Sequence, residues 1–211
     1  MPSLRQLLAA HAPLLLIDAA SARVQVGWLT GEGAARWENS DATAGIGIFR
    51  GVESLGINVR DAGAFLFCEG PGSVLGIRTS AMALRTWCVI APRPVFAYGS
   101  LALTAHALGR GDTTVIADAR RDSWHCFQLG GVLRRVPTAE LAGELALPEN
   151  FRHWSPLPAG VARVPYSLAE MLRRVADVEL FHATDAPDAF LHEEPSYATW
   201  TPKIHRAPAG P

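Results

Sequence analysis

The chain has 211 residues, a formal net charge of −1 at pH 7 and a hydrophobic share of 49%. This length fits one large or two small domains, and the hydrophobic share is sufficient for a core. The balanced charge disfavours tight direct binding of nucleic acid by this chain alone, so any role with RNA is expected to need a partner. The three cysteines lack CxxC spacing and are interpreted as thiols of a reducing cytoplasm.

The first forty residues predict one short helix and three strands. Leucines at helical spacing predict a helix over residues 3–11, and strands are expected at 14–18, 23–29 and 34–38. The apolar run at 14–17 is too short to cross a membrane, and no signal-peptide cleavage site follows it. Asp18 ends that run, and a lone Asp in such a place is most often a turn former or helix cap.

A single helix with a loop is predicted for residues 40–59. Its core stripe is expected to consist of Ile48, Val52, Leu55 and Val59. Ile46 and Phe49 lie outside this stripe, and an apolar pair away from the core face predicts a second buried contact, with a partner. The alternative is that Phe49 folds over the edge of the same core.

The stretch from Ala64 to Tyr98 organises the chain as strand, glycine loop, helix and strand. The two apolar strands are expected at 64–68 and 95–98, joined by a helix that must end before Pro92. This is a parallel crossover with a loop at the carboxyl end of its first strand. The loop and helix start contain Gly70, Pro71, Gly72, Ser73, Gly76 and Arg78.

Two interpretations of the glycine loop remain open. Its glycines and the unpaired N–H groups of the helix start are able to cradle a phosphate, or the glycines provide a tight turn with close helix packing. Arg78 lies in the first turn of the helix, where a cation opposes the macrodipole. We therefore expect Arg78 to pair with Asp18, Glu69 or a partner protein.

The second half is predicted to contain a linker helix at 100–108 and strands at 113–119, 124–129 and 132–136. Thr138 is expected to begin a helix to Leu145, and Ser167 with Glu170 predicts a capping box for a helix to Val175. Residues 201–211 contain three prolines and are expected to form a disordered tail.

No catalytic machinery is predicted. Ser73 invites comparison with a nucleophile, but its loop lacks the G-x-S-x-G elbow and no His and acid can be assigned to it. The seven histidines include no i, i+3 or i+4 pair, so the sequence encodes no helical metal site.

The glycine loop carries a family resemblance. Gly70-Pro71-Gly72-Ser73, followed by Gly76 and Arg78, resembles the signature of the TsaB family, which is also labelled glycoprotease-like or peptidase M22-like. Asp118-Ala119-Arg120 and Glu194-Pro195-Ser196-Tyr197 resemble two further segments of that family.

The resemblance implies an α/β fold, of the two-lobed actin-like or RNase H-like class of the sugar kinase, Hsp70 and actin superfamily. Residues 1–104 would form the actin-like lobe with the glycine loop, and residues 105–200 a smaller lobe. Asp18 would be the relic of a nucleotide site.

The family also implies a function. TsaB is the non-catalytic partner in tRNA N6-threonylcarbamoyladenosine synthesis, which binds the catalytic subunit TsaD and works with the ATPase TsaE. This chain would accordingly contact a TsaD-like protein through Ile46, Phe49 and Arg78, meet tRNA only indirectly, and lie in the cytoplasm. The family uses the same helices for homodimers.

No cofactor or metal is expected on this chain alone, because ATP or ADP and the metal would belong to the partner subunit. Two alternatives stay open. One is a degenerate or active peptidase M22-like hydrolase, and the other is an orphan homodimeric interaction protein.

Overall fold

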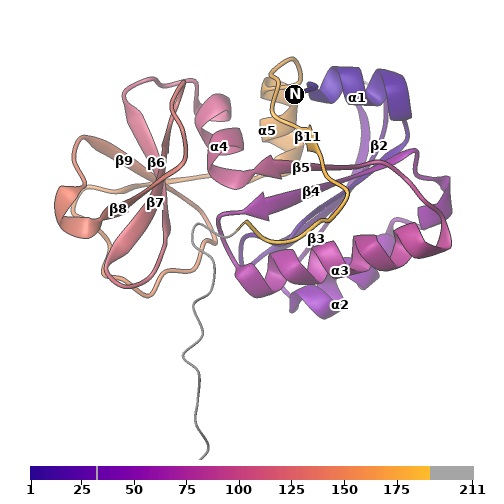
Figure 1. The fold of residues 1–211 in the computed structure, drawn as a ribbon, viewed down its shortest axis with the longest axis horizontal. Coiled ribbons are helices and arrows are strands. Elements are labelled where there is room, and N and C mark those ends of the chain that lie inside the picture. Colours follow the sequence, from indigo (N-terminus) through magenta and orange to yellow (C-terminus); the bar gives the residue numbers. More distant parts are fainter. Residues whose placement is uncertain (32, 191–211) are drawn as a thin grey trace, which may run out of the picture.

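The computed structural model describes residues 1–31 and 33–190, which form two mixed β-sheets with helices packed around them (Figure 1). The predicted tail at 201–211 and the Glu194–Tyr197 motif lie outside the described residues. Among the described helices, none is both long and apolar enough to cross a membrane.

The first sheet has six strands in the order β11-β5-β4-β1-β2-β3. Strands β1, β4 and β5 are parallel, β2 is antiparallel to both of its neighbours, and β11 is antiparallel to β5. The bounds are β1 Leu14–Asp18, β2 Val24–Gly31, β3 Ala34–Ser40, β4 Ala64–Gly70, β5 Val95–Gly99 and β11 His182–Ala183.

The second sheet has five strands in the order β10-β9-β6-β7-β8. Its bounds are β6 Thr113–Asp118, β7 Ser123–Gln128, β8 Arg134–Pro137, β9 Glu144–Pro148 and β10 Ala162–Val164. Strands β6, β9 and β10 are parallel, and β7 is antiparallel to both of its neighbours. In chain order, the pairing therefore repeats that of β1 to β5 in the first sheet.

Helices cover both faces of the first sheet. Figure 1 shows α2 and α3 on one face, α1 and α5 on the other, and α4 between the two sheets. The helices are α1 Leu4–His11, α2 Ala44–Ser54, α3 Val74–Ile90, α4 Ser100–Leu108 and α5 Leu168–Arg174, with short 3₁₀ turns at Val59–Asp61 and Thr138–Glu140.

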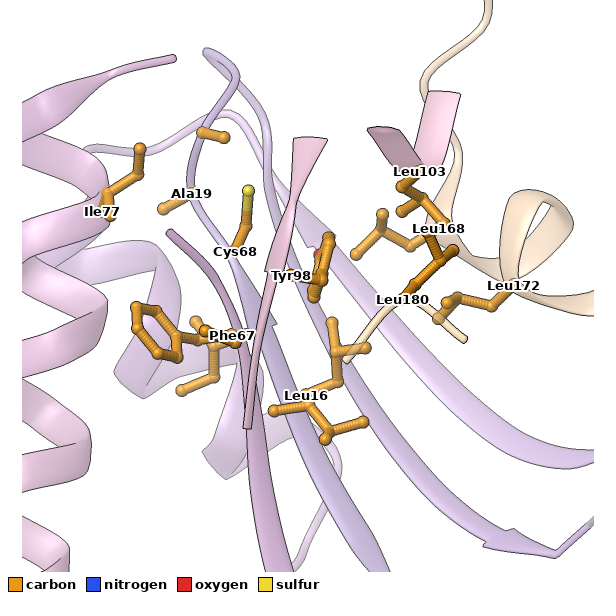
Figure 2. Close-up of a cluster of buried hydrophobic side chains, with 14 of the residues drawn as sticks. Leu16, Ala19, Phe67, Cys68, Ile77, Tyr98, Leu103, Leu168, Leu172 and Leu180 are labelled. Atoms are coloured by element: carbon orange, nitrogen blue, oxygen red, sulfur yellow. The ribbon is translucent and has the colours of Figure 1, made fainter. Parts of the chain in front are cut away.

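The core of the first lobe surrounds its central strands. Every residue of β1 is buried, as expected for a strand covered on both faces. In Figure 2, Phe67 lies toward Ile77 of α3, whereas Leu168 and Leu172 of α5 lie on the other side of the strands. Helix α3 buries Ile77, Ala81 and Leu84 against this core, and Cys88 further along it is partly buried.

Three local predictions are wrong. Helix α2 ends at Ser54, because Leu55 caps it and Gly56 takes a left-handed conformation (φ 61°), so Val59 lies in a separate 3₁₀ turn. The helix predicted at 138–145 is a 3₁₀ turn followed by β9, whose buried apolar run pairs with β6. Ser167 makes no side-chain cap, because the Glu170 N–H donates to the Ser167 carbonyl (3.2 Å) instead of to its hydroxyl.

Part of the second half of the chain contributes to the first sheet. Residues 182–183 return to the first sheet as β11, where they cover the edge of β5. The Arg5 N–H donates to the Ala176 carbonyl (3.0 Å), and the Phe181 N–H donates to the Pro2 carbonyl (3.2 Å). The first lobe is thus completed by the end of the described chain.

Candidate functional site

The glycine loop between β4 and α3 is packed against the backbone that follows β1. Gly70 has φ 118°, a left-handed conformation that favours glycine. A Cβ at Gly72 would lie 2.4 Å from the Ala20 carbonyl oxygen, and one at Gly76 would lie 2.1 Å from that of Ala19. This close approach accounts for both glycines without a ligand.

The polar groups of the same loop are engaged within the chain. The Ser73 N–H donates to the Ala20 carbonyl (2.7 Å), and Ser73 Oγ accepts a hydrogen bond from the Gly76 N–H (3.3 Å). Ser73 is therefore the N-cap of α3. The Pro71 carbonyl accepts a hydrogen bond from Ser100 Oγ (2.5 Å), which ties the loop to the start of α4.

Arg78 pairs with an acid that the sequence did not indicate. Its Nε lies 3.6 Å from Asp188 Oδ1, and Arg85 Nη2 lies 3.9 Å from Asp188 Oδ2. The expected pairing of Arg78 with Asp18 or Glu69 is wrong, because Asp18 is buried among tyrosines and Glu69 pairs with His182 (3.2 Å). Arg78 remains half-exposed at the side of α3.

Asp18 is fully buried at the carboxyl end of β1. Its Oδ2 accepts hydrogen bonds from the hydroxyls of Tyr98 and Tyr166, both at 2.7 Å, and its Oδ1 accepts one from the Ala20 N–H (2.9 Å). Gln25 holds Tyr166 over the carboxylate, because Gln25 Nε2 donates to the Tyr166 carbonyl (3.1 Å). Figure 2 shows Tyr98 and the neighbouring Cys68 at this end of the strands.

Burial governs the proton equilibria of this cluster. Desolvation raises the pKa of Asp18 above its ordinary value, although the hydrogen bonds from Tyr98, Tyr166 and Ala20 act in the opposite direction. Desolvation and the nearby Asp18 charge also place the pKa values of Cys68, Tyr98 and Tyr166 well above their usual range. Both tyrosines therefore remain protonated donors.

A second carboxylate, Asp118, ends β6, the strand that corresponds to β1 in the repeated pairing pattern. It accepts hydrogen bonds from the N–H groups of Arg120 (2.5 Å), Trp154 and Ser155 (2.9 Å), and from Ser155 Oγ (3.3 Å). Partial burial would raise the pKa of Asp118, but these hydrogen bonds outweigh it and the pKa lies below its ordinary value.

Both strand-end carboxylates are thus surrounded by donors of the chain itself. Three donors converge on Asp18 and four on Asp118, which leaves little capacity to coordinate a cation. Over residues 1–31 and 33–190, no group of three or more His, Cys, Asp or Glu side chains has an arrangement suited to a metal ion.

An apolar surface lies across α2 and α3. The residues that sequence reasoning placed off the core face, Ile46 and Phe49, are 47% and 51% exposed. Phe49 packs edge-on against Trp87 of α3, with ring centroids 6.1 Å apart. Exposed apolar residues of the two helices include Val89 and Ile90 at the end of α3. We define the α2–α3 surface by the other five, which are Ile46, Phe49, Val74, Leu75 and Met82.

Sequence reasoning missed the partners of both carboxylates. Tyr98 gave a usable signal, because a tyrosine at the end of a buried strand needs a partner for its hydroxyl. Tyr166 and Trp154 gave none, since they are 148 and 36 residues from the acids that they contact.

The fold matches solved structures of low sequence identity. YeaZ from Pseudomonas aeruginosa superposes with a TM-score of 0.57 and 22% identity, over 77% of this chain and 89% of that chain. The chain has the two-lobed, actin-like fold of YeaZ. A second structure, of an uncharacterized protein with similarity to peptidase YeaZ from Pseudomonas aeruginosa, gives a TM-score of 0.55 with the same identity and coverage. No family model matches the sequence, and no curated protein matches it significantly.

Proposed function

We propose that this chain is a non-catalytic subunit for tRNA N6-threonylcarbamoyladenosine modification that binds a TsaD-like catalytic subunit through the α2–α3 surface. YeaZ and TsaB are two names for one protein, so the fold agrees with the resemblance carried by the glycine loop. In this proposal, the TsaE-like ATPase and tRNA approach through the complex. ATP or ADP and the metal belong to the partner, and the complex lies in the cytoplasm.

The observation that carries the proposal is the exposed apolar surface on two adjacent helices. Leu75 is 79% exposed and Met82 is 57% exposed, and their spacing of seven residues places them on one side of α3. Phe49 stands half-exposed on α2, against Trp87. Exposed apolar side chains gathered on two neighbouring helices support an interaction surface.

The state of the polar groups favours a scaffold over a hydrolase. Ser73 Oγ caps α3, and among residues 1–31 and 33–190 no hydrogen bond links a histidine to either strand-end carboxylate. Asp18 instead holds two tyrosine hydroxyls together in the core. The geometry therefore supports structural roles for the residues that most invite a catalytic assignment.

The test is the variant Phe49→Glu, compared with Val132→Glu in the second lobe, where Val132 is 72% exposed. Burial of one Phe contributes about 1.5–3 kcal/mol. Phe49→Glu is therefore expected to weaken binding of the TsaD-like protein about tenfold or more. Sedimentation of the mixture measures the complex, and a thermal melt checks the monomer.

Val132→Glu is expected to leave association unchanged. If both variants bound the TsaD-like protein equally well, the proposal would be contradicted. A large fall in the melting temperature of Phe49→Glu would assign Phe49 to the core. Loss of a self-dimer without any binding of the TsaD-like protein would favour the orphan homodimer. Peptide hydrolysis that disappears in Ser73→Ala would favour the hydrolase.

A further inference from the structure

Trp154 is an exposed aromatic side chain in the loop between β9 and β10. It is 64% exposed, and Arg120 Cζ lies 4.4 Å from the centroid of its ring. This distance is that of a cation–π contact, in which a guanidinium lies over an aromatic face. The contact joins the loop after β9 to the turn between β6 and β7.

The position of Trp154 is fixed by the backbone on either side. The N–H groups of Trp154 and Ser155 both donate to Asp118 Oδ2, and Ser155 Oγ donates to Asp118 Oδ1. His153 Nδ1 lies 3.1 Å from the Ser155 carbonyl oxygen. The indole is therefore held in place before any ligand arrives, which lowers the ordering cost of binding.

The facing turn has an unfavourable backbone conformation. Arg120, Arg121 and Asp122 have φ values of 61°, 50° and 53°, so three consecutive non-glycine residues are left-handed. Glycine would adopt this conformation without strain. Arg135 Nη2 lies 3.3 Å from the Ala119 carbonyl and 3.4 Å from that of Arg120, and so supports the turn. Strain of this kind suggests that the side chains themselves are used.

Arginine side chains lie on the turn that faces the indole and next to His153, the residue before it. Arg120, Arg121 and Arg163 are exposed, and none of them pairs with a carboxylate in the described part of the chain. Arg163 Nη2 lies 3.4 Å from His153 Nε2, beside Trp154. Two acids lie among these arginines, Asp118, which accepts four hydrogen bonds from the chain, and the exposed Asp122 of the turn.

We propose that these residues, which we call the Trp154 platform (Arg120, Arg121, His153, Trp154 and Arg163), bind RNA that contains unpaired bases. One base stacks on Trp154, and phosphates contact the exposed guanidiniums of Arg121 and Arg163. Proteins recognise unpaired bases by stacking on aromatic and guanidinium planes. The overall charge of −1 conceals this local group of cations. The inference concerns the isolated chain and does not depend on the scaffold role.

The chemistry of the Trp154 platform suits RNA better than it suits an apolar protein surface. Trp and Arg are also common in protein interfaces, but there they are surrounded by other residues that exclude water. Here the exposed Arg120 lies over the indole and the exposed Arg163 contacts the adjacent His153, so that guanidiniums are available to phosphates. Contacts with phosphates make the binding affinity depend on salt concentration, whereas the affinity of an apolar protein contact depends on it much less.

The experiment is a fluorescence anisotropy titration of the full chain against a labelled RNA stem–loop and against the same stem as a duplex without a loop. The stem–loop is expected to bind more tightly. Trp154→Ala should weaken stem–loop binding about tenfold or more, since stacking of one base carries that much. Trp154→Phe, which keeps a stacking face, should restore most of the affinity.

Arg121→Gly and Asp122→Gly form a matched pair, because both relieve a left-handed residue of the same turn and change its charge in opposite directions. Neither should lower the melting temperature. Arg121→Gly should weaken stem–loop binding and lower the slope of log K against log salt by about 0.7–0.9. Asp122→Gly should leave binding unchanged or tighten it.

Three results would overturn the proposal. The first is that wild type and Trp154→Ala bind the stem–loop with equal affinity. The second is that Arg121→Gly and Asp122→Gly change stem–loop binding equally. The third is that Trp154→Ala binds RNA normally but binds the TsaD-like protein more weakly. The last result would make the platform a protein contact. None of them changes the outcome expected for Phe49→Glu, so the two proposals fail separately.

Discussion

Asp18 is an acid at a strand end that has become part of the core. A carboxylate without solvent pays a large desolvation cost, which the hydroxyls of Tyr98 and Tyr166 and the Ala20 N–H offset only in part. The remaining cost appears as a raised pKa. Such a group orients its neighbours but opposes folding whenever it is charged.

The pH dependence of stability should show this. Because the folded pKa of Asp18 lies above its unfolded value, the folded state binds the proton more readily, and stability falls as pH rises from the unfolded pKa through the folded pKa. Lowering the pH from about 7 toward about 4 should therefore stabilise wild type relative to Asp18→Asn. Urea unfolding at a series of pH values measures the difference.

Asp177 provides a control, because its contribution to stability should change with pH in the opposite direction. The hydrogen bond and charge of Arg5 lower the pKa of this exposed carboxyl, so its contribution to stability, which is small because the pair is exposed, is present at neutral pH and is lost as pH falls. As pH falls, wild type should therefore lose stability relative to Asp177→Asn and gain stability relative to Asp18→Asn. A flat difference for Asp18→Asn would mean that Asp18 titrates as it does in the unfolded chain.

At the scale of elements, α2 explains an oddity of the sequence. Its start is rich in glycine, which is unfavourable in helices. Gly47 and Gly51 face the sheet, where a Cβ would lie 3.1 Å from Val24 Cγ2 and 2.8 Å from Val26 Cγ2, respectively. Glycine at this spacing lets α2 approach β2 closely. Gly45 faces open space instead.

Alanine substitutions should separate these roles. Gly51→Ala is expected to lower stability by about 1–3 kcal/mol, because the added methyl overlaps a stiff β-branched side chain. Gly45→Ala meets nothing within 4 Å and should raise stability by up to about 1 kcal/mol through helix propensity. Chemical denaturation of both variants measures the pair. A stabilising Gly51→Ala would show that α2 and β2 can separate without cost.

The same elements show how far the sequence could predict the fold. Helix α3 and its flanking strands follow from periodicity and from the glycines that bound them, because those signals are local. The sequence predicts a helix over the β9 segment because a short apolar run fits both a helix and a strand, and only the pairing with β6 distinguishes them. The partners of Asp18 and Asp118 depend on contacts between distant segments, which a single sequence does not encode locally.

At the scale of the whole molecule, the two lobes repeat one strand order and place an acid at the end of the corresponding first strand. Asp18 ties the glycine-loop end of its sheet to Tyr166, while Asp118 ties down the loop that carries Trp154. Arg152 of that loop lines a cavity of about 310 Å³ together with Ser73 and Leu75. The Trp154 platform and the α2–α3 surface are therefore joined by one short segment.

The ends of the described chain also hold the first lobe together. Helix α1 buries Leu4 and Leu7, and the strand-like segment before it pairs with the chain near Glu179. An exposed ion pair between Arg5 Nε and Asp177 Oδ1 (2.6 Å) lies at the same junction. Both apolar burial and this ion pair hold the N-terminal segment against the chain near Asp177. Burial of a leucine usually contributes more free energy than an exposed ion pair, so burial is expected to dominate.

Leu7→Ala should therefore destabilise the protein by about 2–5 kcal/mol, because it removes a fully buried side chain and leaves a cavity. Asp177→Ala should leave the melting temperature almost unchanged, since exposed ion pairs are screened by solvent and salt. Leu8→Ala, at a half-buried position of the same helix, controls for helix propensity and should cost less than Leu7→Ala. Thermal and urea unfolding of the three variants rank them. If Asp177→Ala lowered the melting temperature as far as Leu7→Ala does, the ion pair would be the main stabilising contact. The N-terminal segment would then be held against the chain near Asp177 by electrostatic rather than apolar interactions.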